Sequence, residues 1–200
     1  MKTKITLLFT ALILTVNVLQ AQISVNGKGS KWSRIEAGTA LTPSANFVTT
    51  DADNGDGAAD GALRIKTIDE NAQVQGVQYI LSGTAKADET INLETICYQN
   101  ASSYVKFKVQ IWDATANNVL KEASPQMPSP TSVGAVFPTI NLSYTFQAAE
   151  AGHQIAVRYV RTDGAGKVPD AVYNKARELA IDNLKINNVF VKIDKESLKK

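Results

Sequence analysis

Cysteine and histidine are almost absent from this sequence, with one of each among 200 residues. The single cysteine, Cys97, allows no internal disulfide. It shares a strand face with Ile91 and Leu93 in TINLETICY, which predicts a buried structural thiol rather than a nucleophile. The single histidine, His153, leaves a catalytic triad or a zinc site without a second imidazole, which argues against serine or zinc hydrolase chemistry.

Long apolar runs are also missing, apart from one at the start of the chain. Residues 1–21 combine two lysines, an apolar run over 5–19 and a small residue, Ala21, before Gln22. This order is typical of a secretory signal peptide, with an uncleaved anchor as the alternative. We expect cleavage at or near Gln22, a mature protein that is periplasmic or extracellular, and no stable membrane insertion.

The expected mature chain has a formal net charge of zero. Removing two lysines leaves 21 − 2 = 19 basic residues against 19 acidic ones. This balance indicates no general attraction to nucleic acid. Only the end of the chain leans basic, and residues 191–200 are expected to form a solvated tail.

Helical periodicity is scarce, whereas apolar and polar residues alternate in many short segments. We expect at most one short turn of helix, around 169–180. The alternating segments are rich in β-branched and aromatic residues and are bounded by Gly, Asp, Asn or Ser. They cover residues 61–68, 74–83, 90–98, 103–113, 139–146, 153–162 and 178–187. The pattern predicts an all-β fold, a two-sheet antiparallel β-sandwich (jelly roll) with little or no helix, over residues 22–190.

The segment ELAIDNLKIN, residues 178–187, alternates in two halves that are out of phase with each other. Side chains along a strand alternate between faces, so both apolar pairs can reach the core only if one extra residue is inserted between them. The sequence therefore predicts a β-bulge at the step from Asp182 to Asn183.

The segment SYVKFKVQIW, residues 103–112, has one apolar and one polar face. Val105, Phe107, Val109 and Ile111 share the face expected to point into the core. The other face carries Tyr104, Lys106, Lys108, Gln110 and Trp112. Flat rings beside hydrogen-bonding side chains suit sugars, which present C–H faces ringed by hydroxyls. An ordinary solvated face with its tryptophan covered by a loop is the alternative.

Two polar stretches resemble known binding motifs but do not match them. DADNGDGAADG, residues 51–61, fits no register of an EF-hand loop, which leaves a solvated turn or a metal loop of another geometry. DGAGKV, from residue 163, lacks the glycine and the hydroxyl residue of a phosphate-binding loop, because Arg161 and Val168 occupy those positions.

Short patterns spread along the chain resemble bacterial jelly-roll carbohydrate-binding modules and related galactose-binding-like domains. They are KWSRIEAGT, DGALRI, VKFKVQIWDA, YTFQAAEAGHQIAVRYV and ELAIDNLKI. In such modules a structural calcium joins the first and last strands, and the resemblance assigns its ligands to Glu36 and Asp182, with Asp60 nearby. Calcium takes six to eight oxygen ligands, so carbonyl groups and water would complete such a site.

The resemblance also implies two places for a sugar. Binding on a sheet face would use Tyr104 and Trp112 as stacking rings, whereas binding through the loops would use Trp32, Phe137 or Tyr173. The expected function is therefore binding of an extracellular polysaccharide without cleavage.

Two other functions remain open at this stage. One is a structural or adhesive surface domain that binds protein partners. The other is a small lyase or hydrolase, in which Lys106, Lys108 and Arg158 would neutralise an acidic sugar. No pair of tyrosine and histidine at a recognisable spacing supports the lyase.

Overall fold

The computed structural model describes residues 22–36, 47–50, 62–67, 74–99, 107–125, 135–136, 138–161 and 177–192. In these residues the chain forms strands and one short 3-10 helix, Ala148–Glu150. The strands are β1 (Lys31–Glu36), β2 (Phe47–Thr50), β3 (Ala62–Thr67), β4 (Val74–Ile80), β5 (Thr90–Gln99), β6 (Phe107–Asp113), β7 (Asn118–Ala123), β8 (Ala135–Val136), β9 (Ile140–Thr145), β10 (Ile155–Arg161), β11 (Arg177–Ile186) and β12 (Val189–Phe190). No helix in the described ranges is long and apolar enough to cross a membrane.

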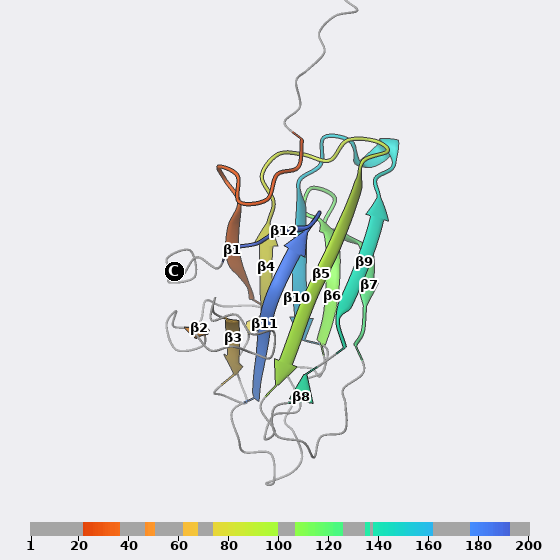
Figure 1. Ribbon diagram of the computed structural model, residues 1–200. Coiled ribbons are helices and arrows are strands. Elements are labelled where there is room, and N and C mark those ends of the chain that lie inside the picture. Colours follow the sequence, from red (N-terminus) through yellow and green to blue (C-terminus); the bar gives the residue numbers. More distant parts are fainter. Residues whose placement is uncertain are drawn as a thin grey trace, which may run out of the picture.

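The strands form two antiparallel sheets that lie one in front of the other (Figure 1). The five-stranded sheet has the order β1-β4-β10-β6-β7. The seven-stranded sheet has the order β2-β3-β11-β5-β8, with β9 paired to β5 and β12 paired to β11. The two sheets are separate, and neither closes on itself. The predicted all-β sandwich with little helix is therefore confirmed.

The core lies between the sheets and is built from the apolar side of each alternating strand. The inward row of β6, Phe107, Val109 and Ile111, is buried as the alternation predicts. Across the core, β5 buries Ile91, Leu93 and Cys97. Removing this apolar surface from water stabilises the sandwich by about 25 cal/mol for each Å² buried.

The predicted bulge in β11 is confirmed. Asp182 pairs with Ile96 and Lys185 pairs with Glu94, so two residues of β11 oppose one residue of β5. Asn183 has a positive φ of 47°, in the left-handed region that asparagine tolerates better than most residues. As a result, the apolar residues on both sides of the bulge, including Ile181, Leu184 and Ile186, are buried.

A buried chain of hydrogen bonds joins the two sheets at this bulge. The hydroxyl of Tyr159 in β10 donates to Oγ1 of Thr95 in β5 over 2.8 Å. Oγ1 of Thr95 donates in turn to the backbone carbonyl of Asp182 over 3.3 Å. Burial raises the pKa of Tyr159 well above its ordinary value and also raises the pKa of Cys97, so both groups remain neutral near pH 7.

Residues far apart in the sequence also meet beside β1. The side-chain amide of Asn26 donates to the carbonyl of Phe190, and its oxygen accepts from the backbone N–H of Lys192. Nε1 of Trp32 donates to the carbonyl of Lys192 over 3.1 Å. Trp32 is only 2% exposed, so its assignment as a loop residue that stacks on sugar is wrong.

The sequence did not predict every element. The edge strand β7 was missed because most of its side chains are exposed, and a strand with little burial needs no apolar alternation. The alternating segments also did not include β1, which only the resemblance implied as a first strand, and the short strands β2, β8 and β12 and the 3-10 helix were missed as well. A turn of helix was expected around 169–180. Within that range the structure describes Arg177–Ala180, and these residues begin β11 rather than a helix. The remaining residues of the range lie outside the described part of the chain.

The conformation of Asn183 gives a test of the bulge. Asn183→Val should lower the free energy of unfolding by about 1–2 kcal/mol, because a β-branched residue is strained in the left-handed region. Asn183→Gly should change it by less than about 1 kcal/mol, because glycine adopts this region freely. Urea unfolding in the presence of a chelator measures both values, and equal losses in the two variants would contradict the assigned backbone conformation.

Candidate functional site

The strand register aligns five polar side chains across the whole five-stranded sheet. Ser33 pairs with Gln78, Gln78 with Arg158, Arg158 with Gln110, and Gln110 with Glu122. Residues paired directly in an antiparallel ladder point to the same face. We call these five residues the polar row, and they lie on the outer face because their neighbours along the strands point into the core.

Hydrogen bonds fix the members of the polar row relative to one another. Nε of Arg158 donates to Oε1 of Gln78 over 2.8 Å, and Nε2 of Gln78 donates to Oγ of Ser33 over 3.1 Å. On the other side, Nε2 of Gln110 donates to Oε2 of Glu122 over 3.0 Å. The row therefore consists of two hydrogen-bonded segments that meet between Arg158 and Gln110.

Lys108 lies beside the polar row and neutralises its one carboxylate. Nζ of Lys108 is 2.6 Å from Oε1 of Glu122. The hydrogen bond from Lys108, together with the bond from Gln110, lowers the pKa of Glu122. Glu122 is therefore ionised at neutral pH, with both carboxylate oxygens occupied.

Trp112 follows Gln110 by two residues in β6, so it lies on the same face, and it stacks against Arg158 of the row. The guanidinium carbon of Arg158 is 3.6 Å from the centroid of the Trp112 ring, which is a cation–π contact. Nε1 of Trp112 is shielded from solvent and has no hydrogen-bond partner in the described part of the chain. Packing rather than a hydrogen bond therefore holds the indole, and one ring face is covered by Arg158.

The structure brings four of the predicted ligand-binding residues together: Lys108, Gln110, Trp112 and Arg158. Tyr104 and Lys106 lie outside the described residues. Ser33, Gln78 and Glu122 were missed because each comes from a different strand, and the pairing register that aligns them is not visible in any one segment.

The predicted metal ligands are placed only in part. Asp182 lies in the bulge and is 2% exposed, and its Oδ1 accepts from the backbone N–H of Asn183 over 2.8 Å. Glu36 is the last residue of β1, with its side chain outside the description, and Asp60 is not described. The described residues contain no cluster of three acidic, histidine or cysteine side chains.

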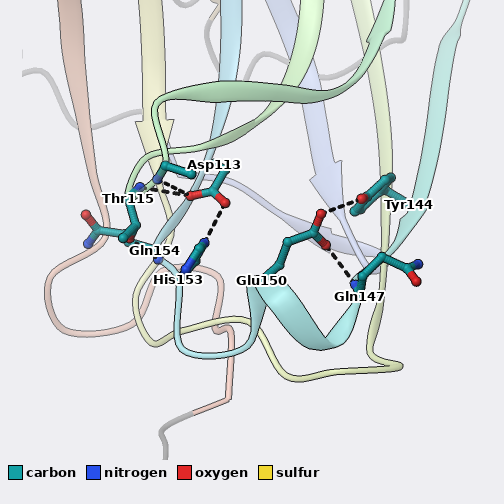
Figure 2. Close-up of polar contacts among 8 residues, drawn as sticks. Asp113, Thr115, Tyr144, Gln147, Glu150, His153 and Gln154 are labelled. Carbon is teal, nitrogen blue, oxygen red and sulfur yellow. Dashed lines mark hydrogen bonds and ion pairs between the residues drawn. The ribbon is translucent and has the colours of Figure 1, made fainter.

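A second polar cluster lies at one end of the sandwich, on the left of Figure 2. Oδ1 of Asp113, at the end of β6, accepts from the backbone N–H groups of Thr115 and Ala116 over 2.9 and 2.8 Å. Its Oδ2 is 2.6 Å from Nδ1 of His153. The backbone N–H of Gln154 donates to Oγ1 of Thr115, so the cluster joins the β6–β7 turn to the start of β10.

Electrostatics make Asp113 an anchor for that turn. Burial raises its pKa, but the bonds from Ala116, His153 and Thr115 outweigh burial and lower it overall. The partner that the structure gives the His153 ring is the Asp113 carboxylate, and among the described residues no serine or threonine hydroxyl bonds to that ring. The pair was missed in the sequence because its members are 40 residues apart.

A separate contact closes the loop before β10, on the right of Figure 2. Oε1 of Glu150 accepts from the Tyr144 hydroxyl over 2.7 Å, and its Oε2 accepts from the backbone N–H of Gln147 over 2.8 Å. Because the Tyr144 hydroxyl donates to the Glu150 carboxylate, its pKa is raised to about 12. Glu150 therefore caps the short helix and is occupied structurally.

Comparison with known proteins finds similarity to solved structures that include carbohydrate-binding modules, at low sequence identity. No protein family and no curated protein matches the sequence. The fold is similar to the enzymatically active domain of tailspike protein 4 from bacteriophage CBA120, with a TM-score of 0.48, 11% identity, and coverage of 78% of this chain and 19% of that one. It is similar to the K1 cleaved adhesin domain of Lys-gingipain from Porphyromonas gingivalis W83 (TM-score 0.46, 12% identity, coverage of 84% and 97%) and to the xylan-binding module CBM15 (0.44, 10%, 86% and 98%).

These similarities include the kind of domain that the sequence patterns resemble. The chain spans 19% of the tailspike chain but almost the whole length of the adhesin domain and of the xylan-binding module. At 10–12% identity, function has to be argued from the residues of this chain.

The Asp113 cluster gives a test that depends on pH. A lowered pKa in the folded state means that the ionised carboxylate stabilises the protein above the ordinary pKa of 3.8, and that this stabilisation is lost as the pH falls below it. Asp113→Asn should therefore reduce stability at pH 6, and the loss should shrink as the pH falls below 3.8. Urea unfolding across this range measures the effect, with Asp88→Asn as the control at an exposed carboxylate. A constant difference between wild type and Asp113→Asn at every pH would contradict the argument.

Proposed function

We propose that this chain is a secreted, non-catalytic domain that binds polysaccharide on the outer face of its five-stranded sheet. The observation that carries the proposal is the polar row beside the stacked Trp112 and Arg158. Secretion rests on the sequence of residues 1–21, which lie outside the described part of the chain.

The composition of the face suits a ligand rich in hydroxyl groups. The side chains of Gln78 and Gln110 each carry donors and an acceptor, and Ser33 can do either. The uncovered parts of the Trp112 ring offer apolar surface for sugar C–H groups. The hydroxyl groups of such a ligand can therefore replace their hydrogen bonds to water with hydrogen bonds to the polar row at little net cost in free energy.

The length of the face favours a polymer over a single sugar. Neighbouring strands lie about 4.8 Å apart, so a row across five strands extends roughly 19 Å. The row crosses the whole sheet from β1 to β7. An extended polysaccharide chain would contact several of its members at once.

The described residues of this face lack the groups that glycoside cleavage requires. Glycosidases place two carboxyl groups on either side of the scissile bond. Glu122 is the only carboxylate in the polar row, and both of its oxygens are bonded, to Lys108 and Gln110. We therefore propose binding rather than hydrolysis.

We also propose that calcium binds at the bulge of β11. Asn183 Oδ1 is buried and has no hydrogen-bond partner in the described part of the chain, and the preceding residue is the buried Asp182, whose Oδ1 accepts from the backbone N–H of Asn183. Carboxylate and amide oxygens are both calcium ligands. The resemblance stated above would add Glu36 and Asp60 to complete the set, and the bound ion would hold the bulge and neutralise Asp182.

The polysaccharide proposal predicts that Trp112→Ala weakens binding by more than tenfold, because loss of a central aromatic ring costs about 2 kcal/mol or more. Trp112→Phe should retain more affinity, because it keeps a ring and Nε1 of Trp112 has no hydrogen-bond partner among the residues that the structure describes. A glycan array identifies the polymers, and isothermal titration measures affinity. Assays for released sugars accompany both, and turnover would contradict the non-catalytic proposal.

Phe190→Ala is the matched control, because Phe190 is an aromatic residue of the seven-stranded sheet that is 52% exposed. It should leave the affinity unchanged. If Phe190→Ala weakens binding while folded Trp112→Ala does not, the site lies on the other sheet.

The calcium proposal predicts a higher melting temperature in millimolar calcium than in chelator. A ligand that binds only the folded state stabilises it by roughly 2.7 kcal/mol at a hundred times its Kd. Asp182→Asn should abolish the difference, whereas Glu122→Gln should retain it because Glu122 is paired with Lys108 on the other sheet. Identical melting curves for the unaltered protein in calcium and in chelator would contradict the calcium proposal.

A further inference from the structure

Arg158 differs from the other partly buried cations of the described chain. Lys108 is paired with Glu122 at 2.6 Å, and Lys185 is paired with Glu94 at 2.7 Å. Arg158 forms no ion pair with any described carboxylate, and its contacts are the neutral amide of Gln78 and the Trp112 ring. Among the described residues, Arg158 is therefore a partly buried positive charge on this face that no carboxylate compensates.

The position of this charge is central. β10 is the third of five strands in the sheet order, and Arg158 is the middle member of the polar row. Glu122 lies on the same face, but Lys108 and Gln110 occupy its two oxygens. The one carboxylate of the polar row, Glu122, is therefore already bonded to partners other than Arg158.

The guanidinium is also held in a fixed orientation. Of its five N–H groups, one is bonded to Gln78, which leaves 5 − 1 = 4 on the terminal nitrogens without a partner in the described residues. The Trp112 ring packs against the guanidinium carbon at 3.6 Å, and Gln78 holds its Nε edge. A planar fork held in this way matches the two oxygens of a carboxylate or of a sulfate ester.

We propose that the ligand is an acidic polysaccharide and that Arg158 binds its carboxylate or sulfate groups. This inference rests on the proposed function and specifies its substrate class. The acidic group supplies the counter-charge that the described face lacks, and the remaining members of the polar row bind hydroxyl groups on either side. Arg158 acts here as the specificity-determining residue, with Gln78 and Trp112 positioning it.

The first experiment compares charged and uncharged forms of the same polymers with the full chain. The probes are polygalacturonate, alginate and hyaluronate, each beside its methyl-esterified form, together with dextran sulfate beside dextran and with neutral xylan and mannan. At least one charged polymer should bind about tenfold or more tightly than its uncharged form. The polyuronate and sulfate arms distinguish the two anions, and the preference should shrink as salt screens the charge.

Variants then assign the preference to Arg158. Arg158→Gln should remove it, and Arg158→Lys should restore only part of it, because an ammonium group keeps the charge but lacks the planar fork. Lys185→Gln is the matched control, since it removes one positive charge from the outer face of the other sheet, and it should keep the preference.

The outcomes separate this inference from the proposed function. Equal binding of charged and uncharged polymers, binding of neutral polymers alone, or a preference that survives Arg158→Gln would overturn the inference and leave polysaccharide binding in place. Binding of no polymer would contradict both. The comparison of acid and ester forms uses the unaltered protein, so the test stands even if Arg158→Gln fails to fold.

Discussion

The relative position of the two sheets depends on one buried contact, in which Tyr159 reaches across the core to Thr95 and Thr95 reaches the carbonyl of Asp182. An unpaired hydroxyl at this depth would cost about 1–3 kcal/mol, so any other alignment of these strands is disfavoured. Because side chains alternate along β10, the inward direction of Tyr159 also turns Arg158 outward. The core contact and the exposed cation are therefore consequences of one register.

The side chains of the proposed binding face are aligned by the register of the strands and not by a loop. Each of the five strands contributes one member of the polar row, and the hydrogen bonds within the row hold these side chains before a ligand arrives. A preformed surface loses less conformational entropy on binding than a flexible one. The stack of Arg158 on Trp112 places charge and aromatic surface at one point of the face.

The sequence predicted features that depend on alternation within one strand. These include the inward row of β6, the buried Cys97 and the bulge at Asp182, because core burial imposes a period of two on each strand. It could not predict Ser33, Gln78 and Glu122 as neighbours, since register between strands is set by tertiary packing. Alternation also placed Trp112 on the outer face, but only the structure shows that Arg158 covers one side of its ring.

β11 lies between β3 and β5 and holds the seven-stranded sheet together, although it is formed by residues 177–186. The strands that precede it, β2 with β3 and β5 with β9, pair within their own groups and not with each other. As the chain emerges from its amino end, these two groups present open edges until β11 is available to join them. Completion of the seven-stranded sheet therefore waits for a strand that begins 177 − 67 = 110 residues after β3 ends, which favours slow folding and a period of exposure to aggregation.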